Sequence, residues 1–94
     1  HGGVSGSIAD NAAGFAAMTL MDKEKEPLTI EFKINFLNIA DGEKLVAEAE
    51  ILQAGRSIFH GESKVYTIKK KEKLLTATAL VTIKATSKVS EKLR

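Results

Sequence analysis

The chain has 94 residues, the length of one domain, and we expect a single domain over residues 1–94. Apolar residues make up 44% and charged residues 28%, which is typical of a folded protein, and a net charge of +2 is too small to favour nucleic acid or a membrane surface as partner. The absence of cysteine excludes disulfides and thiolate chemistry and fits a cytoplasmic protein. Because the first residue is His1 rather than methionine, we expect an N-terminal strand or segment upstream of it.

Residues 3–21 are predicted to form one helix. Apolar side chains recur along it at helical spacing, at Val4, Ile8, Ala12, Phe15 and Met18. The segment also contains Gly6 and Gly14, and each costs about 0.5–1 kcal/mol relative to alanine. We therefore expect small residues to let this helix pack closely against a sheet. The charged residues 22–27, which end in proline, are predicted to be a connector.

Downstream of the connector the apolar period changes to two, which predicts strands over residues 28–36, 45–52, 58–68 and 74–86. In the first strand every second residue from Leu28 to Phe36 is apolar, so we expect one apolar face. Gly61 is expected to weaken the third strand. Turns are predicted at residues 41–42, 54–57 and 69–73, and a loose or helical tail at 87–94. The pattern predicts an α+β layer in which the helix covers an antiparallel sheet with two open edges.

Asp10 is the first candidate for chemistry. On a helix it shares one side with small residues, namely Gly3, Gly6, Ser7, Gly14 and Ala17. A carboxylate on such a strip has room for another molecule and could act as general base or nucleophile. The alternative is an exposed aspartate that bonds a neighbouring backbone group.

The sequence His1-Gly2-Gly3 stands at the start of the predicted helix. Free backbone N–H groups at a helix N-terminus, aided by the helix dipole, can bind an anion or a developing oxyanion. The alternative is a flexible turn, which is a common use of two glycines.

The remaining polar residues carry weaker signals. His60 shares a strand face with Glu62 and Lys64 and is expected to face solvent, and Asn11 either lines a site or is structural. Arg56 is either a solvated turn residue or a phosphate contact, and the same two interpretations apply to the lysine-rich turn. Two scattered histidines without clustered carboxylates predict no metal site, and no nucleotide-binding glycine motif or Ser-His-Asp triad is present.

Taken together, HGGVSGSIADNAAG and LTIEFKINFLNIADGEKLVAEAEILQAGRS resemble the hotdog-fold acyl-CoA thioesterases of the phenylacetate-degradation (PaaI) type, in the 4-hydroxybenzoyl-CoA thioesterase superfamily. The resemblance covers most of the chain and extends to the last strand. It implies a five- or six-stranded antiparallel sheet wrapped around one long central helix, with two such units paired edge to edge. It also implies hydrolysis of acyl-CoA thioesters without a cofactor.

The resemblance assigns roles to individual residues. It implies that the Gly2 backbone N–H polarises the thioester carbonyl, that Asp10 is the catalytic carboxylate, and that Thr29 helps to hold the water. It places Gly55, Arg56 and Ser57 near the CoA moiety, and His1, Gly3 and Asn11 are further candidates for substrate contact.

The spacing of Gly2 and Asp10 predicts a homodimer. Eight residues of helix separate them by about 12 Å along the axis, so one thioester carbon cannot lie within about 3 Å of both. An isologous dimer with antiparallel helices would bring Gly2 of one subunit to Asp10 of the other, and a dimer of dimers is a further possibility.

Three functions are alternatives to a thioesterase: a non-catalytic acyl-CoA-binding hotdog protein, a structural module, and a hotdog dehydratase. The absence of a His-Phe-Pro-Gly motif argues against the dehydratase.

Overall fold

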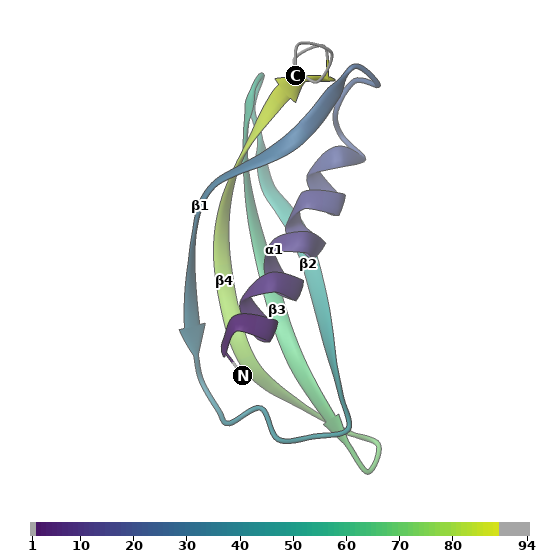
Figure 1. Cartoon of the computed structure of the whole chain (residues 1–94), viewed down its shortest axis with the longest axis vertical. Coiled ribbons are helices and arrows are strands. Elements are labelled where there is room, and N and C mark those ends of the chain that lie inside the picture. The colour runs from purple at the N-terminus through teal and green to yellow at the C-terminus, as the bar shows by residue number, and fades with distance from the viewer. Residues whose placement is uncertain (1, 89–94) are drawn as a thin grey trace.

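The computed structural model describes residues 2–88 and shows one helix lying against one face of a curved antiparallel sheet (Figure 1). Helix α1 (Gly2–Met18) is followed by β1 (Lys25–Phe36), β2 (Lys44–Ala54), β3 (Ile58–Lys69) and β4 (Glu72–Ser87). The strand order is β1-β4-β3-β2, so β1 and β2 are the edges. The predicted helix and four strands are confirmed, although the described strands are fewer than the five or six that the resemblance implies.

The face of the sheet under the helix is made by alternate residues of the two central strands. Val81 and Ile83 of β4 and Phe59 and Val65 of β3 belong to this face, and along both stretches buried residues alternate with exposed or half-buried ones. This period of two is what the sequence predicts for strands that are covered on one side. The apolar face of β2 completes the core from the edge, with Leu45, Ala47, Ala49 and Ile51 packed against it.

A two-residue turn joins β3 to β4, at the predicted lysine-rich reversal. Lys70 and Lys71 both have positive φ, 49° and 70°, as a type I′ hairpin turn requires. Lys69 adjacent to the turn lies 3.5 Å from the Asp41 carboxylate, and the backbone N–H of Lys70 donates to Glu43. The loop between β1 and β2 is thereby held against this hairpin.

Strand β1 contains a β-bulge that the sequence pattern does not reveal. Its pairing with β4 skips Ile30, so that Thr29 lies opposite Ile83 while Phe32 lies opposite Val81. Both partners are buried, and Thr29 therefore faces the helix together with the aromatic half of the strand. Leu28 lies opposite the exposed Lys84 and is on the outer face. The prediction of a single apolar face from Leu28 to Phe36 is wrong, because the extra residue reverses the alternation.

The helix packs on the sheet through its smallest residues. Ser5, Gly6, Ala9, Ala13 and Ala17 are its buried positions. The predicted apolar stripe is not this face: Val4 is 52% exposed, Phe15 66% and Met18 42%. Small residues occupy this face because the backbones of helix and sheet approach closely. The hydroxyl of Ser63 in β3 donates to the carbonyl of Ala9 at 2.7 Å.

Gly61 belongs to the same close approach. A Cβ at this position would lie 3.6 Å from the Cβ of Ala13 and 3.2 Å from Cδ1 of Ile51. Instead of weakening β3, as the sequence suggests, this glycine lets the helix lie down on a strand that runs unbroken over twelve residues.

Two predicted assignments around the connector differ from the structure. The helix ends at Met18 rather than at residue 21, because residues 19–21 form a tighter turn whose bonds include Leu20 N–H to Ala17 C=O at 2.9 Å. Pro27 lies inside β1 rather than in a connector, which an edge strand tolerates. Most of the predicted tail, residues 89–94, lies outside the described residues. Within residues 2–88, no helix is long and apolar enough to cross a membrane.

Candidate active site

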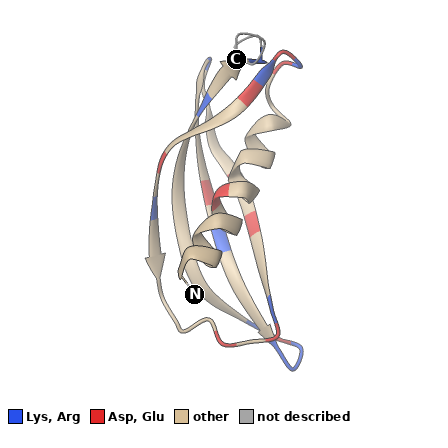
Figure 2. Ribbon diagram, viewed as in Figure 1, with Lys and Arg blue, Asp and Glu red and all other residues tan. Residues whose placement is uncertain are grey.

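Asp10 is the only charged residue of α1, as Figure 2 shows by the single red band on the helix. It is half-buried, and its Oδ1 accepts a hydrogen bond from the Thr29 hydroxyl at 2.6 Å. A hydrogen bond to a charged acceptor is short and strong, and it fixes the carboxylate against the sheet. Among the described residues no other hydrogen bond to this carboxylate is found, so Oδ2 is free to meet a ligand.

The bulge in β1 is what brings Thr29 to Asp10. Without the extra residue, the alternation that points Phe32 at the helix would point Thr29 at solvent. The sequence singled out both residues, but nothing in the sequence pattern placed one against the other.

A pocket of about 180 Å³ opens beside this pair. Its lining comes from the outward side of α1 and from the start of β1, and consists of Asp10, Asn11, Gly14, Phe15, Met18, Pro27 and Thr29. Phe15 and Met18, two residues of the predicted helical stripe, are therefore walls of the pocket rather than core. The strip of small residues around Asp10 is divided: Gly6 and Ala17 are buried against the sheet, whereas Gly14 lies in the pocket.

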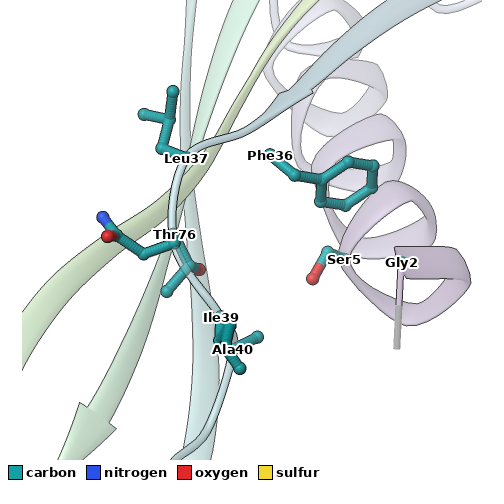
Figure 3. Close-up of a pocket in the computed structure, with 8 residues that line it drawn as sticks. Gly2, Ser5, Phe36, Leu37, Ile39, Ala40 and Thr76 are labelled. Atoms are coloured by element: carbon teal, nitrogen blue, oxygen red, sulfur yellow. The ribbon is translucent and has the colours of Figure 1, made fainter.

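A larger pocket of about 500 Å³ lies at the N-terminal end of α1 (Figure 3). It is bounded by the first turn of the helix, the end of β1 and the loop that follows, and is lined by Gly2, Ser5, Phe36, Leu37, Asn38, Ile39, Ala40 and Thr76. The ring of Phe36 packs on Gly2, where a Cβ would come within 3.0 Å of the ring. The backbone N–H groups of a first helical turn have no partner within the helix, so this pocket has donors at one end.

The structure does not bring Gly2 and Asp10 into one pocket of a single chain. Each lines a different cavity, as the predicted separation of about 12 Å along the helix requires. Gly3 is exposed, with open space where a Cβ would stand, and His1 lies outside the described residues.

Gly55, Arg56 and Ser57 form the predicted turn between β2 and β3. The N–H of Gly55 donates to the carbonyl of Ile58, and a Cβ on Gly55 would stand 2.7 Å from that oxygen, so the turn requires glycine. Gly55 and Arg56 line a separate hollow of about 180 Å³ near the C-terminal end of α1, with Asp22 and Lys25. Neither residue lines the Asp10 pocket.

The other ionisable residues lie away from these pockets. His60 is exposed on the outer face, as predicted, and residues 2–88 contain no cluster of side chains that could hold a metal ion. On the same outer face, Nζ of Lys73 lies 2.7 Å from the Glu48 carboxylate, and the pKa of Lys73 is raised by that hydrogen bond.

Sequence reasoning missed the polar residue that faces the larger pocket. Ser5 lies on the buried side of α1, and its position three residues after Gly2 was the available signal, since residues at that spacing share a helical face. The apolar wall at residues 36–40 carried no such signal, because its course depends on bonds from Leu37 and Asn38 to the distant Thr76.

The chain belongs to the Thioesterase superfamily, whose sequence model matches residues 1–74. A thioesterase family protein of known structure from Silicibacter pomeroyi is 37% identical, with a TM-score of 0.90 over 93% of this chain and 64% of its own. A Bacillus halodurans protein solved with CoA is 24% identical, with a TM-score of 0.85 over 92% of this chain and 58% of its own. A Haemophilus influenzae thioesterase is 22% identical, with a TM-score of 0.82 over 93% of this chain and 59% of its own.

The chain therefore spans less than two thirds of the length of these three structures. A comparison with curated proteins found no match. The structural likenesses confirm the predicted hotdog fold, in which an antiparallel sheet wraps one helix.

Proposed function

We propose that this chain is the catalytic part of an acyl-CoA thioesterase of the PaaI type, with Asp10 as general base or nucleophile. The observation that carries the proposal is the hydrogen bond from Thr29 to Asp10, which holds the one carboxylate of α1 at the edge of a pocket. Membership of the Thioesterase superfamily supports the reaction type. The fold is also one that accommodates CoA in the Bacillus halodurans neighbour.

Two routes use this geometry. As a base, Oδ2 of Asp10 takes a proton from a water molecule while the water oxygen attacks the thioester carbon. As a nucleophile, the carboxylate attacks that carbon itself and forms an anhydride, which water then hydrolyses. In both routes the carbonyl oxygen becomes negative and is stabilised by the Gly2 N–H, and the CoA thiolate leaves and takes up a proton. Thr29 orients the carboxylate rather than taking part in the bond changes.

The proposed site is shared between two copies of the chain. Since Gly2 and Asp10 line different pockets, a thioester can meet both only if antiparallel helices from two protomers lie side by side. The helix face turned away from the sheet supports a second copy, because Val4, Phe15 and Met18 are all more than 40% exposed there. Analytical sedimentation at micromolar protein tests this: a fully active monomer would exclude the shared site.

The turn at Gly55–Ser57 and the lysines at 69–71 are the proposed contacts for the CoA phosphates. Arg56 is exposed at the mouth of a hollow and is not tied to the core, so its guanidinium is available for a phosphate. These residues contribute to binding and not to the bond changes.

The experiment is a panel of aryl-, short-, medium- and long-chain acyl-CoAs, with release of the CoA thiol as the readout. Asp10→Asn preserves shape and removes the reacting oxygen, so kcat should fall by about 10²–10⁴-fold while acyl-CoA affinity and thermal stability are kept. Glu50→Gln is the matched control, because this exposed carboxylate of β2 lines neither the Asp10 pocket nor the pocket at the N-terminal end of α1 and should leave kcat unchanged.

Retention of more than about half of wild-type kcat in Asp10→Asn would make the carboxylate structural and the mechanism wrong. Binding of acyl-CoA without turnover by the wild-type protein would instead favour the alternative function, a non-catalytic acyl-CoA-binding hotdog protein.

A further inference from the structure

Ser5 stands apart from the other buried polar side chains of residues 2–88. Four such side chains are at most 3% exposed, and the hydroxyls of three of them are hydrogen-bonded: Ser63 to the Ala9 carbonyl, and Thr67 and Thr76 to each other, with Thr76 also donating to Val65. Ser5 is 2% exposed, and its hydroxyl has no hydrogen-bond partner among the described residues. A polar group on a residue this buried normally has a partner in the protein, in water or in a ligand.

The hydroxyl of Ser5 opens on the large pocket at the N-terminal end of α1. No polar side-chain atom of the described residues is both sealed from the surroundings and unpaired, so Ser5 Oγ must reach the pocket that the residue lines. Figure 3 shows its oxygen directed away from the helix toward the loop that carries Ile39 and Ala40. A ligand in this pocket can therefore supply the missing hydrogen bond.

The side-chain donors of the pocket wall other than Ser5 are already bonded. The Thr76 hydroxyl is bonded to Val65, and the Asn38 side-chain amide donates to the Leu75 carbonyl at 2.9 Å. The backbone N–H groups of Leu37 and Asn38 both donate to the Thr76 carbonyl, at 2.8 and 3.3 Å. The remaining side chains of the wall are apolar, so the helix offers the pocket two donor positions, the backbone N–H groups at the Gly2 end and the Ser5 hydroxyl.

The spacing of these two donor positions sets the length of a ligand that can reach both. Ser5 follows Gly2 by three residues, about 4.5 Å along the helix. In an acyl thioester, an oxygen on the third carbon is four bonds from the carbonyl oxygen, a path that spans at most about 5 Å. An oxygen on the second carbon falls short of that distance, and one on the third carbon is the first to reach it, with the chain extended.

We infer that the pocket selects 3-hydroxyacyl thioesters, with the Gly2 N–H on the carbonyl oxygen and the Ser5 hydroxyl on the 3-hydroxyl group. This deepens the proposed function and rests on it for the position of the carbonyl. The apolar wall of Phe36, Leu37 and Ile39 receives the rest of the acyl chain. Gly2 and Ser5 come from one protomer, so this selectivity does not depend on which residues a second copy contributes.

The test compares matched substrates that differ by one oxygen. For 3-hydroxybutyryl-CoA and butyryl-CoA, the ratio of kcat/KM values should favour the hydroxylated substrate by about 2- to 13-fold in the wild-type protein, the range set by one hydrogen bond. The 2-hydroxy isomer should show no such preference, and the 4-hydroxy isomer, which reaches Ser5 only with a bent chain, should show a smaller one. In Ser5→Ala the ratio should fall to about 1. Ser7→Ala, on the exposed side of the same helix, is the matched control and should keep the wild-type ratio.

Affinity separates the failure of this inference from the failure of the proposed function. Dissociation constants for the same pair of ligands, measured in the Asp10→Asn background with and without Ser5→Ala, should show the same ratios without turnover. If no thioester is hydrolysed but 3-hydroxybutyryl-CoA still binds more tightly through Ser5, the selectivity holds and the thioesterase is wrong. Equal ratios in wild-type and Ser5→Ala protein, no preference among the three isomers in the wild-type protein, or no binding of either ligand would overturn the inference.

Discussion

Replacing Thr29 by valine tests whether the hydrogen bond to Asp10 positions the reacting carboxylate. The hydroxyl donates to Oδ1 at 2.6 Å, and a hydrogen bond to a charged group contributes about 1.5–3 kcal/mol. If that bond holds Asp10 in its reactive orientation, kcat in Thr29→Val should fall by about 10- to 150-fold. Valine keeps the branched shape that suits a strand, so the fold should survive, and KM should change little because Thr29 does not hold the CoA moiety.

Two further variants serve as controls for that experiment. Thr29→Ser restores the hydroxyl and should recover kcat to within a few-fold of wild type. Thr82→Val removes another threonine hydroxyl that donates to a carboxylate, that of Glu31 on the outer face, and should leave kcat unchanged. Wild-type kcat in Thr29→Val would refute the positioning role, and so would an equal loss in Thr82→Val, because the effect would then come from the sheet as a whole.

Three further changes probe binding and fold. Arg56→Ala should raise KM for acyl-CoA with little change in kcat, and a large fall in kcat at constant KM in steady-state assays would argue against a phosphate contact. Gly61→Val should lower the free energy of unfolding by about 1–3 kcal/mol, because its side chain meets the helix; an unchanged urea midpoint would show that the sheet and helix can separate at no cost. Lys70→Asn with Lys71→Gly should raise that free energy by about 1 kcal/mol, because asparagine and glycine suit positive φ, and no gain in urea denaturation would show the lysines to be unstrained.

The elements were predictable because each has a regular period. Alternation over β3 and β4 indicated which residues lie inside, and the change of period near residue 27 separated the helix from the sheet. The face of the helix was not predictable from hydrophobicity, since alanines pack where phenylalanine does not fit. Phe15 is 66% exposed while Ala13 is fully buried, because the distance between helix and sheet decides burial here.

The residues of the candidate site were named from the sequence, but their contacts could not be. Asp10 and Thr29 were both named, yet their contact depends on the bulge at residue 30, and a bulge leaves no mark in an alternating apolar pattern. The pocket wall at residues 36–40 was missed, because hydrogen bonds to Thr76, far along the chain, give that loop its course. Such long-range bonds are invisible to any rule that uses only neighbouring residues.

The packing of α1 gives the residues on its two faces a different tolerance of substitution. Any enlargement at Ala9, Ala13 or Ala17 would push the helix off the sheet, since all three are fully buried. Phe15 and Met18 project the other way and contribute little to the fold, although both line the pocket beside Asp10. Their size and shape can therefore vary without disturbing the packing of the helix on the sheet, and a lineage of such proteins could change its range of acyl groups while this scaffold stays constant.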